Sequence, residues 1–174
     1  PVKIHLFTFA FIDSSINLLR DLVSDKAIFL IHKHNNPCGV AIRDTLSEAY
    51  NDSLACDNIS AFGGILTTNK IIDENTANKI NELFFEILIA PDFEDEALEA
   101  LRSKKNRIIL KLKKIPKEII QKRTCLNGEL EQDFDAKTET FDDFKVVTNT
   151  SPNKNNTDDS VSYTHLTLPT TLSV

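Results

Sequence analysis

The chain has 174 residues, of which 41% are hydrophobic, so it can bury one core of ordinary size. Its 20 Lys and Arg residues are outnumbered by 26 Asp and Glu residues, and the net charge of −6 offers no broad basic surface for nucleic acid or an acidic membrane. Three widely spaced cysteines favour a reducing compartment, and we expect a cytoplasmic protein. The longest strongly apolar run, residues 27–31, is too short to span a bilayer.

The first predicted elements are a helix and a strand. Residues 13–24 carry apolar side chains at helical spacing, after Asp13 or Ser14 as a capping residue. Residues 27–31 form a short, continuously apolar run, which is typical of a strand covered on both faces. Residues 32–40 are rich in turn-forming residues and predict a loop.

An alternation of helices and strands follows this loop. Thr45 and Glu48 fit a capping box, which predicts the start of the next helix. The later elements are expected as strands at residues 61–67, 87–90 and 107–112 and as helices at 73–84 and 94–103. Such alternation predicts an α/β fold with a mostly parallel sheet and helices on both faces. Ligands gather at the carboxyl ends of parallel strands, so we expect a binding site at the loop after the first strand.

The carboxyl-terminal part has a different composition. A two-residue turn at Asn127 and Gly128 predicts a β-hairpin, and residues 141–148 are a candidate for one more strand. Residues 149–160 are almost entirely polar, so we expect disorder there, and the Thr- and Leu-rich stretch 161–174 reads as an artefact. We therefore predict one domain at 1–148 and a disordered or artefactual tail at 149–174. Because the chain starts with Pro1 and lacks methionine, we expect a fragment.

The densest group of reactive side chains is residues 33–39, KHNNPCG. His34 is suited to proton transfer near neutral pH, and the adjacent ammonium of Lys33 favours the neutral imidazole that accepts a proton. Lys33 is also suited to stabilising charge that develops in a transition state. The alternative is an exposed loop with an incidental Lys and His. His32 alternates with apolar residues, which favours a structural role.

A zinc site is the second interpretation of this region. Pro37 and Cys38 resemble half of the Pro-Cys-x-x-Cys element of nucleoside deaminases, but the second cysteine position is occupied by Ala41 and no His-x-Glu element lies upstream. We therefore expect no metal. Cys38 as a nucleophile would need His32 or His34 as its activator, and a buried structural thiol is the favoured interpretation.

A weaker signal is the segment 60–65, SAFGGI, preceded by Asp57. Paired glycines allow a backbone to approach a ligand closely, and Ser60 can donate or accept a hydrogen bond. A bulge or a close packing contact is the structural alternative for the two glycines.

These motifs together carry a resemblance. Residues 33–41, KHNNPCGVA, resemble the Lys-His-x-Asn-Pro-Cys-Gly-Val-Ala motif of the AICAR transformylase domain in the bifunctional purine biosynthesis family. Further segments resemble that family in its own order, at residues 57–65, 85–91, 104–106, 128–135 and 145–148. Several spaced motifs in register are more specific than any one of them.

The resemblance implies transfer of a formyl group from 10-formyltetrahydrofolate to the amine of AICAR, giving FAICAR, in a protein whose other domain closes the product to IMP. It implies that His34 accepts a proton from the amine and that Lys33 stabilises the transition state. The residues it places near nucleotide or folate are Asn36, Ser60, Phe62 and Gly63. It also implies a cytidine-deaminase-like, three-layer α/β/α fold without zinc, and a homodimer.

The departures from the family pattern are also informative. The upstream Arg-Tyr-Gly-Glu-Asn-Pro-His-Gln motif is absent, and a Ser-Tyr-Asn-Asn motif is at best degraded into residues 7–11. The cyclohydrolase domain and the second half of the transformylase domain are missing too. We therefore expect this chain alone to be inactive, and a non-catalytic structural or interaction fragment of the same fold is the alternative.

Overall fold

The structure is a computed structural model that describes residues 6–22, 24–114, 120–134, 145–147 and 149–153. Contacts divide the chain into two compact units, Pro1–Ile115 and Pro116–Val174. Among the described residues, no helix has the length and apolar character needed to cross a membrane.

The first unit is built on a five-stranded mixed sheet with the order β2-β1-β3-β4-β5. Its strands are β1 (Ala27–Lys33), β2 (Asn36–Arg43), β3 (Gly64–Thr68), β4 (Phe85–Ala90) and β5 (Ile108–Lys111). β1 is antiparallel to both β2 and β3, whereas β3, β4 and β5 are mutually parallel. The expectation of a mostly parallel sheet therefore holds only for β3–β5, because two of the four pairings are antiparallel.

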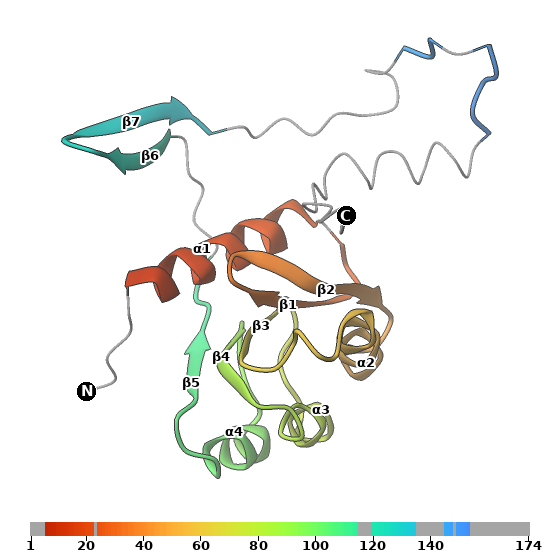
Figure 1. The fold of residues 1–174 in the computed structure, drawn as a ribbon. Helices are drawn as coiled ribbons and strands as arrows, with labels where there is room; N and C mark the ends of the chain where they lie inside the picture. Colours follow the sequence, from red (N-terminus) through yellow and green to blue (C-terminus); the bar gives the residue numbers. More distant parts are fainter. Residues whose placement is uncertain (1–5, 23, 115–119, 135–144, 148, 154–174) are drawn as a thin grey trace. The chain divides into compact units, whose positions relative to one another are not determined.

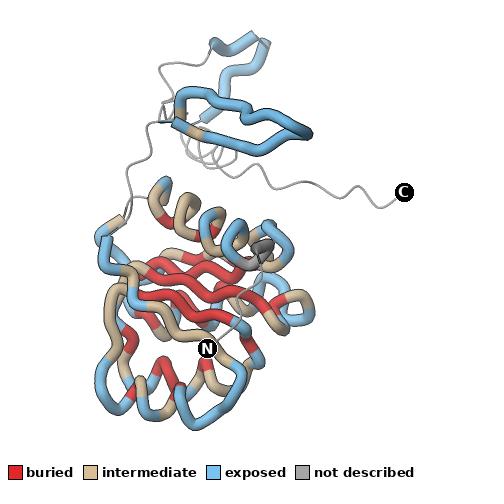
Figure 2. Tube along the Cα trace, turned by 90° about the vertical axis from the view of Figure 1, so that its left-hand side faces the viewer, coloured by how far each residue is buried: buried red, intermediate tan, exposed pale blue. Residues whose placement is uncertain are grey.

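Helices cover both faces of this sheet and complete three layers (Figure 1). The long helix α1 (Leu6–Asp21) packs on β1 and β3 from one side. The opposite face is covered by α2 (Leu46–Cys56), α3 (Glu74–Ile80) and α4 (Asp95–Arg102). Figure 2 shows the buried residues running through the strands between the two helical layers.

Strand β1 is buried on both faces, as its apolar run predicts. Ile28 and Leu30 pack with Leu19 of α1, whereas Phe29 and Ile31 point into the larger core under α2–α4. Full burial of each such side chain contributes roughly 1.5–3 kcal/mol. This strand therefore joins the two halves of the core.

The predicted capping box of α2 is confirmed. The Glu48 N–H donates to Thr45 Oγ1 at 3.3 Å, and the Thr45 N–H donates to the Glu48 carboxylate at 3.3 Å. Asp73 caps α3 with its own side chain, because its Oδ1 accepts the Thr76 N–H at 2.7 Å. α3 then ends at Ile80, four residues before the predicted end.

The predicted loop at 32–40 is wrong, because this segment forms a tight β-hairpin between β1 and β2. His34 and Asn35 are its two turn residues, and both have positive φ, 52° and 66°, as a type I′ turn requires. Pro37 is tolerated because β2 is the edge strand of the sheet. Cys38 is the extra residue at the register shift between Ile31 and His32.

Helix α1 begins earlier than predicted, at Leu6 instead of residue 13. The reason is packing: Phe11, Ile12 and Ile16 are half-buried against the isoleucines of β3 and β4. This contact extends the helix by two turns beyond the predicted cap.

The second unit contains a predicted hairpin, β6 (Ile120–Cys125) and β7 (Gly128–Asp133). The turn is shifted by one residue, because Gly128 already pairs with Cys125 and the two turn residues are Leu126 and Asn127. Most of the candidate strand at 141–148, and residues 154–174 of the predicted tail, lie outside the described residues.

Candidate functional site

The predicted site lies at the end of the sheet where strand β1 ends and strand β3 begins. His32 of β1 pairs with Ile65 of β3, and Gly64 pairs with Phe85 at the start of β4. Because β1 runs antiparallel to β3, the carboxyl end of β1 meets the amino ends of the parallel strands. The expected position at the carboxyl ends of parallel strands is therefore wrong.

Lys33 is joined to the loop before β3. Its Nζ atom donates a hydrogen bond to the carbonyl oxygen of Phe62 at 2.6 Å. Gly63 follows with φ of +74°, and its N–H donates to the carbonyl oxygen of Phe84 at 2.8 Å. The rings of Phe62 and Phe84 pack with their centroids 5.0 Å apart. The predicted residues Lys33, Phe62 and Gly63 therefore lie together.

Ser60 belongs to the same loop and shapes it through Asp57. The Ser60 N–H donates to Asp57 Oδ1 at 2.9 Å, and the Ala61 N–H donates to the Asp57 carbonyl oxygen. Hydrogen bonds from Ser60 hold the pKa of Asp57 below its usual value, and the charge of Lys33 contributes in the same direction. The carboxylate of Asp57 and the ammonium of Lys33 are thus close enough to interact electrostatically.

His34 faces a different neighbour from Lys33. Its ring meets the ring of Phe11 in α1 edge to face, with centroids 6.3 Å apart. Asn36 is exposed and stands opposite Lys33 in the β1–β2 ladder. The turn thus directs its two candidate catalytic side chains to separate partners, Lys33 to the loop before β3 and His34 to α1.

The thiol of Cys38 is half-buried and donates a hydrogen bond to the Ile31 carbonyl oxygen at 3.4 Å. Burial raises the pKa of Cys38, so the thiol is favoured over the nucleophilic thiolate. This state agrees with the predicted structural role.

His32 is the buried histidine of the region, with only 1% of its surface exposed. Burial lowers its pKa from 6.5 to about 4, so the ring is neutral at physiological pH. Within the described part of the chain, its Nδ1 atom has no hydrogen-bond partner.

The packed rings of Phe62 and Phe84 form an exposed apolar shelf beside Lys33, and these two residues are 58% and 40% exposed. Ile59, earlier in the same loop, is 84% exposed. Ile59 and Phe84 were not predicted as site residues. Phe84 falls at the end of a predicted helix and next to a second Phe, so no pattern distinguishes the exposed ring from the buried one.

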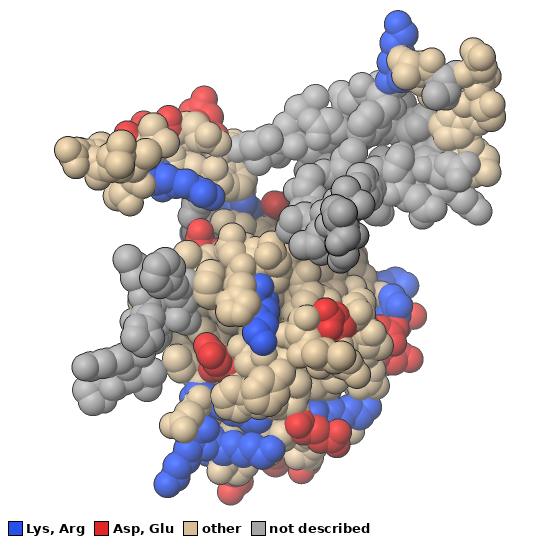
Figure 3. All heavy atoms as spheres, viewed as in Figure 1, with Lys and Arg blue, Asp and Glu red and all other residues tan. Residues whose placement is uncertain are grey.

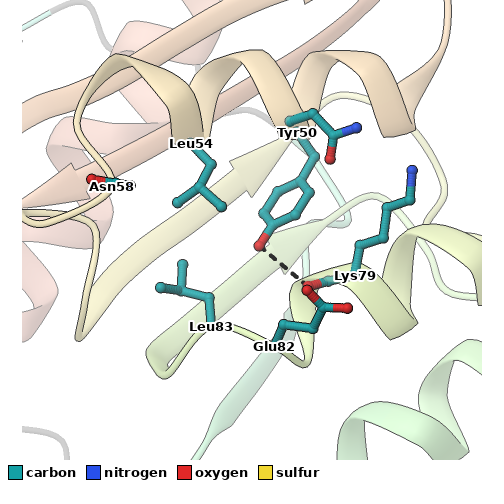
Figure 4. Close-up of a pocket in the computed structure, with 7 residues that line it drawn as sticks. Tyr50, Leu54, Asn58, Lys79, Glu82 and Leu83 are labelled. Atoms are coloured by element: carbon teal, nitrogen blue, oxygen red, sulfur yellow. Dashed lines mark hydrogen bonds between the residues drawn. The ribbon is translucent and has the colours of Figure 1, made fainter.

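A separate cavity of about 360 Å³ lies between α2 and α3 (Figure 4). Tyr50 stands at its centre, with its hydroxyl donating to the Lys79 carbonyl oxygen at 3.4 Å, and Leu54 and Leu83 supply apolar walls. Burial raises the pKa of Tyr50 to about 12. None of the six predicted site residues lines this cavity.

The surface carries both signs of charge. On the face in Figure 3, acidic and basic side chains are interspersed over the first unit. In the portion of the chain that the structure describes, no three His, Cys, Asp or Glu side chains are grouped so that they could hold a metal ion. The absence of zinc stays a prediction.

Comparison with known proteins identifies the family. The family model described as "AICARFT/IMPCHase bienzyme" matches residues 9–166. The chain belongs to this family.

Three similar proteins align with 69% to 83% of this chain. The "Bifunctional purine biosynthesis protein PurH" of Bacteroides thetaiotaomicron is 49% identical over 148 residues, which is 83% of this chain and 29% of the relative. The protein of the same name from Lactobacillus acidophilus is 40% identical, over 80% of this chain and 28% of the relative. The one from Clostridium botulinum is 45% identical, over 69% of this chain and 24% of the relative. The chain thus spans less than a third of the length of these bienzyme-family proteins.

Proposed function

We propose that this chain supplies the catalytic turn of a purine-biosynthetic formyltransferase, which moves a formyl group from 10-formyltetrahydrofolate to the amine of AICAR. The observation that carries the proposal is the position of Lys33, whose Nζ atom is hydrogen-bonded beside the exposed ring of Phe62. Membership of the AICARFT/IMPCHase bienzyme family supports it.

In the proposed reaction, the AICAR amine attacks the formyl carbon. The bond from that carbon to N10 of the folate then breaks, and N10 keeps the bonding electron pair and takes up a proton, so that tetrahydrofolate leaves. The amine is a weak nucleophile because its electrons are delocalised into the imidazole carboxamide ring. His34 accepts the proton that the amine loses, and the ammonium of Lys33 stabilises the negative charge that develops on the formyl oxygen. Correct positioning of amine and formyl carbon supplies a further part of the rate.

The apolar shelf gives this reaction a surface for planar rings. Phe62 is 58% exposed beside a lysine, which suits contact with a heteroaromatic ring that carries polar groups. Ser60, Gly63 and Asn36 are proposed to lie near the nucleotide or folate. We further propose a cytidine-deaminase-like fold without zinc, a homodimeric complete protein and a cytoplasmic location.

A second candidate is a non-catalytic fragment with the same fold. The specific observation in its favour is that the chain spans 29% of the length of its Bacteroides relative. Under this proposal the chain keeps the core and the β1–β2 hairpin, but its site needs substrate contacts that other parts of the protein would supply.

The test compares the complete protein from the same source with its Lys33→Ala and His34→Ala variants, using formyl transfer from 10-formyltetrahydrofolate to AICAR as the assay. We expect turnover to fall by a factor of about 10² or more for each variant while AICAR binding is retained. Lys113→Ala, at an exposed lysine outside the site and outside the family motifs, is the matched control and keeps full turnover. A complete wild-type protein that binds AICAR and transfers nothing would establish the non-catalytic alternative.

A further inference from the structure

One peptide group connects Lys33 to Phe84. The peptide between Phe62 and Gly63 accepts the Lys33 Nζ hydrogen bond at its carbonyl oxygen and donates its N–H to the Phe84 carbonyl oxygen, at 2.6 Å and 2.8 Å. The C=O and N–H of a trans peptide point in opposite directions, so the two bonds hold the plane of this group from both sides. Hydrogen bonds in series also polarise and strengthen one another.

The backbone at this point needs such a restraint. Gly63 has φ of +74°, a conformation that glycine adopts without the strain imposed by a side chain. A peptide group next to a glycine can rotate with little steric resistance. Without the bond to Phe84, the Phe62 carbonyl oxygen would be free to turn away from Lys33.

The ring of Phe84 supports the same peptide. It packs against the Phe62 ring at 5.0 Å and lies 3.8 Å from the position that a Cβ atom on Gly63 would occupy. Phe84 also directly precedes β4, whose first residue pairs with Gly64. Its backbone position beside β4 thus fixes Phe84, while its ring covers the Phe62–Gly63 peptide. The residue remains 40% exposed.

We propose that Phe84 is a positioning residue, which holds the Phe62–Gly63 peptide and through it the ammonium of Lys33. Its importance for turnover rests on the proposed function, whereas the positioning itself does not. Replacing Phe84 by alanine keeps the backbone hydrogen bond from Gly63 but removes the ring that packs on Phe62 and covers Gly63. The Phe62–Gly63 peptide then rotates more readily, and Lys33 loses its acceptor more often.

The test measures the chemical reactivity of Lys33 in the full 174-residue chain. A brief pulse of acetic anhydride, followed by mass spectrometry, gives the acetylation rate of each lysine in wild type, Phe84→Ala and Phe84→Tyr. We expect Lys33 to be acetylated about threefold faster in Phe84→Ala, as loss of one exposed hydrogen bond implies, and at the wild-type rate in Phe84→Tyr, which keeps the ring.

Lys79 is the matched control, because its Nζ atom is likewise held, by Ser47 Oγ at 2.5 Å, but in another part of the unit. Its rate should not change in any variant. An unchanged Lys33 rate in folded Phe84→Ala overturns the proposal, and so does an equal increase at Lys33 and Lys79, which would indicate general loosening. If Phe84→Ala does not fold, Phe84→Leu gives the same comparison, because it keeps apolar volume without an aromatic face. Formyl transfer is not measured, so failure of this proposal is separate from failure of the proposed function.

Discussion

The Nζ atom of Lys33 donates a hydrogen bond to the carbonyl oxygen of Phe62, a residue 29 positions away in the chain. The bond joins the hairpin to the loop before β3. It also leaves the ammonium at the surface, where an exposed hydrogen bond adds little to folding. We infer that Lys33 is placed for chemistry and not for stability.

Replacement of Lys33 separates these two roles. Lys33→Met should change the free energy of unfolding by no more than about 0.5 kcal/mol, because its bond is exposed. In the complete protein the same change should reduce kcat by a factor of about 10². Urea titration and a formyl-transfer assay measure the two quantities. A large loss of stability with unchanged kcat would reverse the assignment.

His32 makes stability depend on pH. Its pKa is about 4 in the folded chain against 6.5 for an ordinary histidine, so below pH 6.5 the unfolded state binds a proton that the folded state does not. The contribution of neutral His32 to the free energy of unfolding is therefore fully present above pH 6.5 and is lost as the pH drops toward 4. The loss over this window amounts to about 3 kcal/mol, at about 1.4 kcal/mol per pH unit.

His32→Leu should remove this loss, because leucine fills the buried position without a titrating ring. Urea titrations at pH 7 and pH 4.5 give the difference for each variant. His34→Gln, at the exposed histidine of the turn, is the control and should keep the wild-type decline. An equal decline in His32→Leu and wild type would show that other groups cause it.

Gly39 is needed where β2 packs against α2. A Cβ atom at this position would lie 2.0 Å from the backbone carbonyl oxygen of Ser53, which cannot move away as a flexible side chain can. Gly39→Ala should therefore destabilise the first unit by about 3 kcal/mol, as overpacking of a tight contact does. Gly128→Ala is the control, since its Cβ would come no closer than 3.7 Å to Cys125. Denaturation followed by circular dichroism compares them, and equal stabilities would contradict the contact.

The chain should hold no stoichiometric zinc. Ala41 stands where a second ligand cysteine would be needed, and burial keeps the Cys38 thiol protonated. Elemental analysis of the chain after growth in zinc-supplemented medium and dialysis should find much less than one equivalent. One retained equivalent would support a deaminase-type metal site.

The sequence predicted the elements whose signals are local. The capping box at Thr45 and Glu48, the doubly buried strand β1 and the strand–helix alternation through β5 are all present. These features depend on residues within a few positions of one another. The motif resemblance assigned catalysis to Lys33 and placed Ser60, Phe62 and Gly63 near nucleotide or folate. The contact between Lys33 and Phe62 was not itself predicted, because no local pattern places residues 29 positions apart in contact.

The direction of β1 could not be predicted in this way. Residues 36–39 contain Asn, Pro and Gly, which favour turns, but here they begin an edge strand, where a missing N–H and a bulge are tolerated. The antiparallel pairing of β1 with β3 is a tertiary choice with no local signal. Phe84 was missed because exposure of one phenylalanine beside a buried one depends on how β4 enters the sheet.

The hairpin that carries Lys33 and His34 also has a consequence for the order of folding. Its strands β1 and β2 are joined by two residues, and α2 follows at once and packs on both. Contacts between residues close in sequence form quickly, since little loop entropy is lost. We therefore expect the segment from β1 to α2 to assemble first, with the reactive turn already shaped, and the pairing of β1 with β3 to follow as the slower, long-range step.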